Sequence, residues 1–194
     1  DRGKNTVDDP GDRKIIGNEE PRYIYSFTLS GDWNNIWFNA FFQGVGKQDW
    51  YPSNEASVFW GQYNRPYNQM PTWHVDNYWT PENPDAYMPR YAGYYRPFYS
   101  GHQNANTRYL QNVAYLRLKN LQIGYNLPTE WTKKVHLSKV GVYLSCENLF
   151  TWSPLYKRTK DINVSNIGTA DPDLTTGSGD GYNYPMMKSI SLGL

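Results

Sequence analysis

Hydrophobic and polar side chains alternate in several separated segments of this 194-residue chain. Tyr23, Tyr25, Phe27 and Leu29 occupy one parity, while Ser26, Thr28 and Ser30 occupy the other. The last six residues repeat the pattern, with Ile190, Leu192 and Leu194 alternating with Ser189, Ser191 and Gly193. A period of two is typical of a β-strand with one apolar face. The pattern therefore predicts such strands near both ends of the chain.

Three further strands are predicted between these two. Residues 36–45 follow a tight turn at residues 31–35 and are apolar on both parities, but their β-propensity is high. Residues 113–126 form the next strand, and residues 140–147 alternate cleanly again. The strand at 113–126 changes parity in its middle, because its leucines at 116 and 118 are out of phase with the apolar residues at 121, 123 and 125. One extra residue restores the phase, so we predict a β-bulge near Asn120.

The connections between these strands alternate in length. The turn at 31–35 and the connector at 128–139 are short, whereas residues 46–112 and 150–187 are long and irregular. The short connector is expected to hold one helical turn at residues 129–135, capped by Thr129 or Thr132. Long irregular segments are unusual within a compact soluble domain. Short turns at one end and long loops at the other are typical of a transmembrane β-barrel.

Composition narrows the class of protein only partly. Aromatic residues make up 17% of the chain, charged residues 19%, and the mean hydropathy is −0.79. Alternating membrane strands with large polar loops have this composition, but so does a soluble all-β carbohydrate-binding or adhesin domain. The formal net charge of +1 and the scattered Arg and Lys residues give no reason to expect a nucleic-acid partner. Cys146 is the single cysteine and lies on an apolar parity, where it is expected to act as a small hydrophobic residue.

Two neighbouring segments closely resemble the last hairpin of one family of membrane proteins. They are YLRLKNLQIGYNLP at residues 115–128 and VYLSCENLFTW at residues 142–152. The family is the SusC/RagA group of TonB-dependent outer-membrane transporters. Further blocks resemble the same family in the same order, at residues 15–23, 38–47, 78–90 and 184–185.

The resemblance implies an all-β fold, an antiparallel transmembrane β-barrel of about 22 strands. Residues 1–194 are then expected to be the C-terminal part of this barrel, with the plug and the N-terminal strands absent from this chain. Both long loops are expected outside the cell, and both short connectors in the periplasm. Ile190, Leu192 and Leu194 are expected to face lipid, with Ser189 and Ser191 facing the lumen. Tyr23, Tyr125 and Trp131 are candidates for the aromatic girdles.

The resemblance also implies a function. The expected activity is TonB-dependent import of oligosaccharides across the Gram-negative outer membrane. The expected partners are the rest of the barrel, membrane lipid, a SusD-like surface lipoprotein that acts as a lid, and TonB acting through the absent plug. Peptide import by the same type of barrel, a soluble all-β binding domain, and a structural barrel without transport are the alternatives.

The aromatic residues of the long loops are the candidate substrate contacts, because flat apolar rings stack on sugars. The candidates are Trp50, Trp60, Trp73, Trp79, Tyr94 and Tyr95. The same rings can instead pack the loop against itself, the barrel rim or a lid. The three histidines lack metal-ligand spacing and are expected to be surface or packing residues. Asp171, Asp173 and Asp180 are expected to form a solvated turn, and no catalytic residue, metal or cofactor is predicted.

Overall fold

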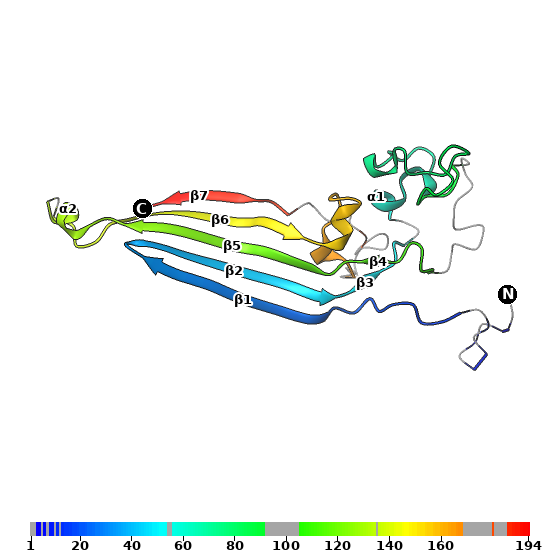
Figure 1. The fold of residues 1–194 in the computed structure, drawn as a ribbon, viewed down its shortest axis with the longest axis horizontal. Helices are drawn as coiled ribbons and strands as arrows, with labels where there is room; N and C mark the ends of the chain where they lie inside the picture. The colour runs from blue at the N-terminus through cyan, green and yellow to red at the C-terminus, as the bar shows by residue number, and fades with distance from the viewer. Residues whose placement is uncertain are drawn as a thin grey trace.

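The computed structural model describes residues 3–4, 6, 8–9, 11, 13–53, 56–91, 105–134, 136–168, 180 and 186–194. Five long strands of this part form one antiparallel sheet in the order β1-β2-β5-β6-β7 (Figure 1). They are β1 (Arg22–Trp33), β2 (Ile36–Lys47), β5 (Tyr115–Asn126), β6 (Gly141–Trp152) and β7 (Ser189–Gly193). The sheet confirms the predicted all-β antiparallel class. Each of β2, β5 and β6 pairs with a strand on both sides, and β1 and β7 are the edges of the described sheet.

The ends of β1 and β6 differ most from the predicted strand boundaries. Strand β1 continues through Trp33, so the predicted turn at residues 31–35 shortens to Asn34 and Asn35. These two residues have φ angles of 48° and 68°. Positive φ at both central positions is the conformation of a type I′ hairpin turn, which asparagine tolerates better than most residues. Strand β6 extends to Trp152 instead of ending near Glu147.

The predicted β-bulge is confirmed one residue from the expected position. Phe42 of β2 pairs with Leu118, and the preceding Phe41 pairs with Asn120, so Lys119 has no partner there. The register with β6 also shifts between Leu118 and Asn120. The extra residue keeps the apolar residues on both sides of the bulge on one face of the sheet.

The sheet has one apolar and one polar face. One row of cross-strand neighbours on the apolar face consists of Phe27 of β1, Phe42 of β2, Leu118 of β5 and Phe150 of β6. The adjacent rung on the opposite face reads Ser26, Gln43, Arg117 and Thr151. The rings of Phe27 and Phe42 stack with centroids 4.8 Å apart. The period-two pattern of the sequence therefore becomes a chemical difference between the two faces.

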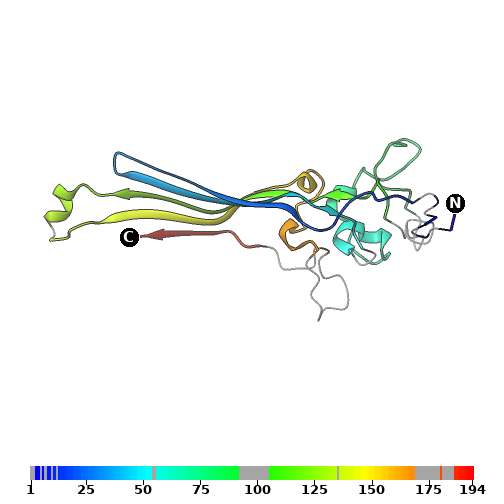
Figure 2. The same ribbon diagram turned by 90° about the horizontal axis from the view of Figure 1, so that it is seen from below.

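The residues that the structure describes leave the apolar face uncovered. Figure 2 shows the sheet as a thin single layer, and no helix of the described residues lies across its strands. Ile190 and Leu192 are 66% and 76% exposed, and Leu29 of β1 is 53% exposed. An apolar surface of this extent marks a site of contact with another apolar phase. Among the described residues, no helix is long and apolar enough to cross a membrane.

The connections are sorted by length between the two ends of the sheet (Figure 1). The β1–β2 turn and the connector with α2 (Thr129–Lys133) lie at one end, and both long loops lie at the other. The predicted helical turn is therefore present, but its predicted cap is wrong. Pro128 occupies the N-cap position, no side chain caps the helix, and its carbonyl accepts the amide of Trp131 instead.

The described parts of the two long loops are folded and share one core. The first contains β3 (Asp49–Trp50), α1 (Ser57–Trp60), η1 (Gly61–Tyr63), η2 (Thr72–His74) and β4 (Gln111–Asn112). The second contains η4 (Pro154–Lys157) and η5 (Val164–Asn166). Trp60, Met88 and Tyr109 of the first loop pack in the same buried cluster as Leu155 and Ile162 of the second. The two loops therefore stabilise each other above the end of the sheet.

Candidate functional site

Two of the predicted substrate-binding aromatics lie inside the loop core. Trp50 is 3% exposed and Trp60 is fully buried. The indole N–H of Trp50 donates to Asp180 at 2.8 Å, and that of Trp60 donates to the carbonyl of Ser53 at 2.9 Å. Buried indoles with satisfied N–H groups are typical packing residues. In this structure neither ring presents a face to a ligand.

The other four candidates differ in position. Trp73 packs against His74 and Phe59, with ring centroids 4.2 and 5.2 Å away. Trp79 is 37% exposed, and its backbone amide donates to the carbonyl of Met88. Tyr94 and Tyr95 lie outside the described residues. A substrate contact by Trp73, Trp79 or either tyrosine therefore stays a prediction, and Trp79 is the most accessible of the four candidate indoles.

His74 and Asp180 are both buried. His74 is a packing residue whose Nε2 lies 2.9 Å from the carbonyl oxygen of Phe59. Burial lowers the pKa of His74 to about 4, and the hydrogen bond to Phe59 opposes this shift. The expectation of a solvated turn is wrong for Asp180, which is 7% exposed. Asp171 and Asp173 lie outside the described residues.

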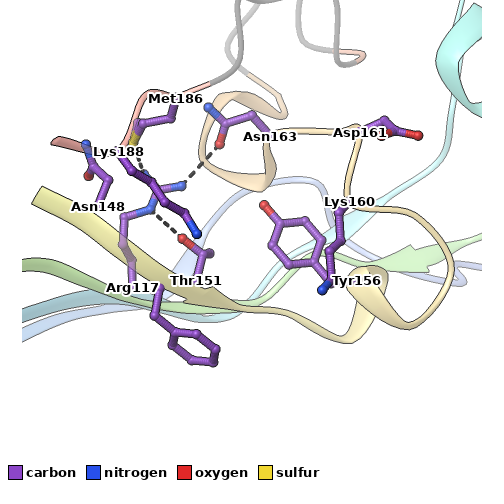
Figure 3. Close-up of a pocket in the computed structure, with 10 residues that line it drawn as sticks. Arg117, Asn148, Thr151, Tyr156, Lys160, Asp161, Asn163, Met186 and Lys188 are labelled. Carbon is purple, nitrogen blue, oxygen red and sulfur yellow. Dashed lines mark hydrogen bonds between the residues drawn. The ribbon is translucent and has the colours of Figure 1, made fainter.

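A cavity of about 290 Å³ lies between the polar face of the sheet and the second long loop (Figure 3). Its walls come from three segments that are distant in sequence: the β5–β6 pair, residues 156–163, and the residues just before β7. The lining residues are Arg117, Asn148, Phe150, Thr151, Tyr156, Lys160, Asp161, Asn163, Met186 and Lys188. Figure 3 shows Arg117 and Thr151 on one side and Tyr156 and Asp161 on the other.

Arg117 forms the centre of one wall. Its side chain is 6% exposed. Its Nε donates to Thr151 Oγ1 at 2.9 Å and its Nη2 to Asn163 Oδ1 at 3.2 Å. Its Nη1 lies 3.1 Å from Ser165 Oγ and 2.9 Å from Met186 Sδ. All four acceptors are neutral, so these bonds fix the position of the guanidinium without cancelling its charge.

Irregularity in the sheet shapes the same wall. The register shift between β5 and β6 leaves Asn148 without a cross-strand partner, and its φ angle is 50°. Its amide Nδ2 donates to the carbonyl of Met187 at 3.2 Å. Bulges commonly redirect side chains beside binding sites. Here the bulge ties the segment before β7 to the wall that carries Arg117.

The lining of the cavity carries more positive than negative charge. Among the lining residues that the structure describes, Arg117, Lys160 and Lys188 oppose one carboxylate, that of Asp161. One oxygen of Asp161 already accepts the hydroxyl of Thr159 at 3.1 Å. Sequence reasoning missed this site, because Arg and Lys residues seemed scattered along the chain. The signal in the sequence was Arg117, a cation at one of the polar positions of a strand whose pattern is typical of a membrane strand.

Two known proteins are similar to nearly the whole of this chain. The chain is 28% identical over 183 residues to TonB-dependent receptor P3 of Formosa agariphila, and 28% identical over 186 residues to TonB-dependent receptor P26 of the same organism. Each match covers 94% of this chain. The chain resembles the TonB-dependent receptors. This confirms the resemblance drawn from the sequence, although the chain spans only 17–18% of the length of these relatives. No family model matches the sequence.

Solved structures of a peptide importer are also similar in part. The RagAB peptide importer in its open-open state matches 72% of this chain at 22% identity, with a TM-score of 0.48. A second structure of the RagAB peptide transporter matches the same share at 21% identity, with a TM-score of 0.49. Each match covers 14% of the RagAB chain.

Proposed function

We propose that this chain is the C-terminal part of the barrel wall of a SusC/RagA-type, TonB-dependent transporter in the Gram-negative outer membrane. The observation that carries the proposal is the single-layered antiparallel sheet with an uncovered apolar face and a polar face opposite. In a barrel wall the apolar face contacts lipid and the polar face lines the lumen. The strands of β1, β2, β5 and β6 have 12 residues each, long enough to cross a bilayer when tilted.

The edges of the sheet support the same proposal. Within the described part of the chain, β1 and β7 each pair with a neighbour on one side only. In lipid every backbone N–H and C=O must be paired, so a spanning sheet has to close on itself. We therefore propose that β1 and β7 pair with further strands of the complete barrel, which closes with about 22 strands.

Aromatic residues at the strand ends fit the two girdles of a barrel. Tyr125 and Trp131 lie near the end with the short connectors and are 40% and 61% exposed. Tyr23 lies near the loop end and is 75% exposed. Amphipathic rings prefer the membrane–water interface. In this orientation the short connectors face the periplasm and both folded loops lie outside the cell.

The cargo in this proposal is an oligosaccharide, imported with a SusD-like lipoprotein as a lid over the loops and with TonB acting through the plug. Two features of this chain support this cargo. The loop end carries exposed aromatic surface such as Trp79, and the polar face offers hydrogen-bonding groups next to a cavity. Both features suit a glycan. The proposed role of the chain is therefore in transport.

Deletion of the gene tests this function. The mutant is grown on single glycans and on defined peptides as the only carbon source, with complementation by the intact gene as the control. We expect loss of growth on one class of oligosaccharide and normal growth on its monosaccharides. Loss of growth only on peptides would replace the cargo and keep the transporter. Normal growth on every source, or recovery of the intact protein in the soluble fraction, would contradict the proposal.

A further inference from the structure

We propose that the cavity beside Arg117 binds an anionic oxygen group, a carboxylate or a sulfate ester, carried by the imported cargo. This inference rests on the proposed function, because it names the chemistry of the cargo. The inference also extends the proposed function, because an anion site makes the lumen wall selective for acidic molecules. The relevant observations are the charge of the lining, its hydrogen-bonding groups and its place on the polar face.

The guanidinium of Arg117 is buried in the wall of the cavity. Arg117 is held by three side-chain oxygens and a thioether, and no described carboxylate forms a hydrogen bond with it. A cation withdrawn from water is unfavourable unless an opposite charge is near. Lys188 and Lys160 line the same cavity and add to its positive potential. An anion that enters the cavity therefore compensates charge that the described residues leave largely uncompensated.

The wall of the cavity also holds N–H donors that have no acceptor among the described residues. A guanidinium has five N–H bonds, and four of those of Arg117 are directed at the acceptors given above, so one N–H of Nη2 is left. Asn163 accepts from this same Nη2, and its own amide Nδ2 is buried without a partner in the described structure. The two groups are adjacent and both only donate. Anionic oxygens, which only accept, match them better than the hydroxyls of a neutral sugar.

The two lysines of the cavity are accessible to solvent. Lys160 and Lys188 are exposed, so their ammonium groups can meet a ligand that arrives from solvent. Figure 3 shows the side chain of Lys188 extending into the space between Arg117 and Tyr156. The cavity lies on the polar face at the loop end of the sheet, where cargo enters the lumen in the proposed orientation. A cluster of cations at this entrance attracts acidic cargo over neutral cargo.

Equilibrium dialysis of the complete transporter, purified in detergent, tests the site. The probes are ³⁵S-sulfate and ¹⁴C-acetate, which stand for a sulfate ester and a carboxylate. We expect one saturable site for at least one probe, weakened about tenfold in a Lys160→Ala/Lys188→Ala variant and weakened further by added sodium chloride. Lys157→Ala is the matched control, because Lys157 is exposed on the same loop and does not line the cavity. It should bind like the wild type.

The outcomes separate this inference from the proposed function. Saturation by sulfate alone assigns a sulfate ester, and saturation by acetate alone assigns a carboxylate. Absence of saturable binding, or equal binding by the wild type and the double variant, overturns the site. A neutral growth substrate in the deletion experiment overturns the link to cargo even if the ions bind. Binding with no growth defect on any source would retain the anion site and reject the transport function.

Discussion

Trp50 and Asp180 are joined by a hydrogen bond of 2.8 Å although 130 positions separate them in sequence. The same carboxylate oxygen accepts the backbone amide of Ser53 at 3.3 Å. Asp180 belongs to the second long loop, whereas Trp50 and Ser53 begin the first. A buried carboxylate that accepts from two donors is a strong link between segments. The bond therefore fastens the second loop to the start of the first.

Replacement of Asp180 should loosen this link. Asp180→Ala leaves the buried indole N–H of Trp50 unpaired, which costs about 1–3 kcal/mol of loop stability. Asp180→Asn retains an acceptor oxygen and should lose less. Hydrogen exchange of residues 48–53 in the complete transporter measures the effect, with the exposed Asp85→Ala as the control. Equal exchange in Asp180→Ala and the wild type would contradict the assigned link.

Acid should destabilise the first loop through His74. Its pKa is lowered to about 4 from 6.5, so above pH 6.5 the imidazole is neutral in both the folded and the unfolded loop, and its stabilising contribution is complete. As the pH falls from 6.5 to 4, the unfolded loop takes up a proton that the folded loop excludes. The loss approaches about 3 kcal/mol near pH 4. Its cause is the burial of the ring beside Phe59.

Hydrogen exchange of residues 57–75 measured across this pH range, after correction for intrinsic exchange rates, checks the prediction. His136→Gln is the control, because His136 is exposed in the short connector at the other end of the sheet. It should leave the pH profile unchanged. An opening free energy that stays constant from pH 7 to 4 would contradict the prediction, because it would show that the folded loop takes up the proton on His74 as readily as the unfolded loop does.

Alternation predicted the sheet because a strand repeats every two residues and its signal is local. The phase change between Leu118 and Leu121 was enough to place the bulge, since an extra residue is the simplest way to reverse parity. Strand ends were less accurate. Gly31 and Asp32 favour turns in isolation, yet both pair with β2. Ladder pairing therefore overrode local propensity at the end of the hairpin.

The loop core and the cavity could not be predicted in the same way. Trp60 packs in one cluster with Leu155 and Ile162, which come from another loop, and no periodicity relates them. Arg117 receives its partners from residues 34–69 positions away. Contacts of this range follow from the pairing of the strands, which brings the loops together at one end of the sheet. An aromatic-rich loop sequence does not distinguish a buried ring such as Trp60 from an exposed one such as Trp79.

Gly124 should be intolerant of larger residues. Trp37 of β2 lies over Gly124 of β5, and a Cβ atom added to this glycine would overlap the indole ring. Trp37 also contacts Tyr143, with ring centroids 6.3 Å apart, so a shift of the indole toward β6 would displace a second ring. Gly124→Val should therefore destabilise the wall by about 1–3 kcal/mol. Thermal unfolding, followed by the gel mobility of the folded protein, measures the loss.

A second substitution distinguishes steric overlap from a simple loss of glycine. In a Trp37→Val background the space above Gly124 is empty, so adding Gly124→Val should cost much less than in the wild type. The difference between the two costs is the coupling energy of the pair. Equal costs in both backgrounds would show that the indole does not limit the size of residue 124.

Leu144 and Ser145 offer the sharpest test of the two faces, because they are neighbours on β6 that point in opposite directions. Leu144 pairs with Ile123 and Leu192 on the apolar face, whereas Ser145 pairs with Gln122 and Ser191 on the polar face. If the apolar face contacts lipid, Leu144→Arg should cost about 2–4 kcal/mol and reduce assembly in the outer membrane. Ser145→Arg places the same charge in the wet lumen and should assemble normally. Membrane fractionation with surface proteolysis measures both variants, and the reverse order of assembly would mean that the faces are assigned the wrong way round.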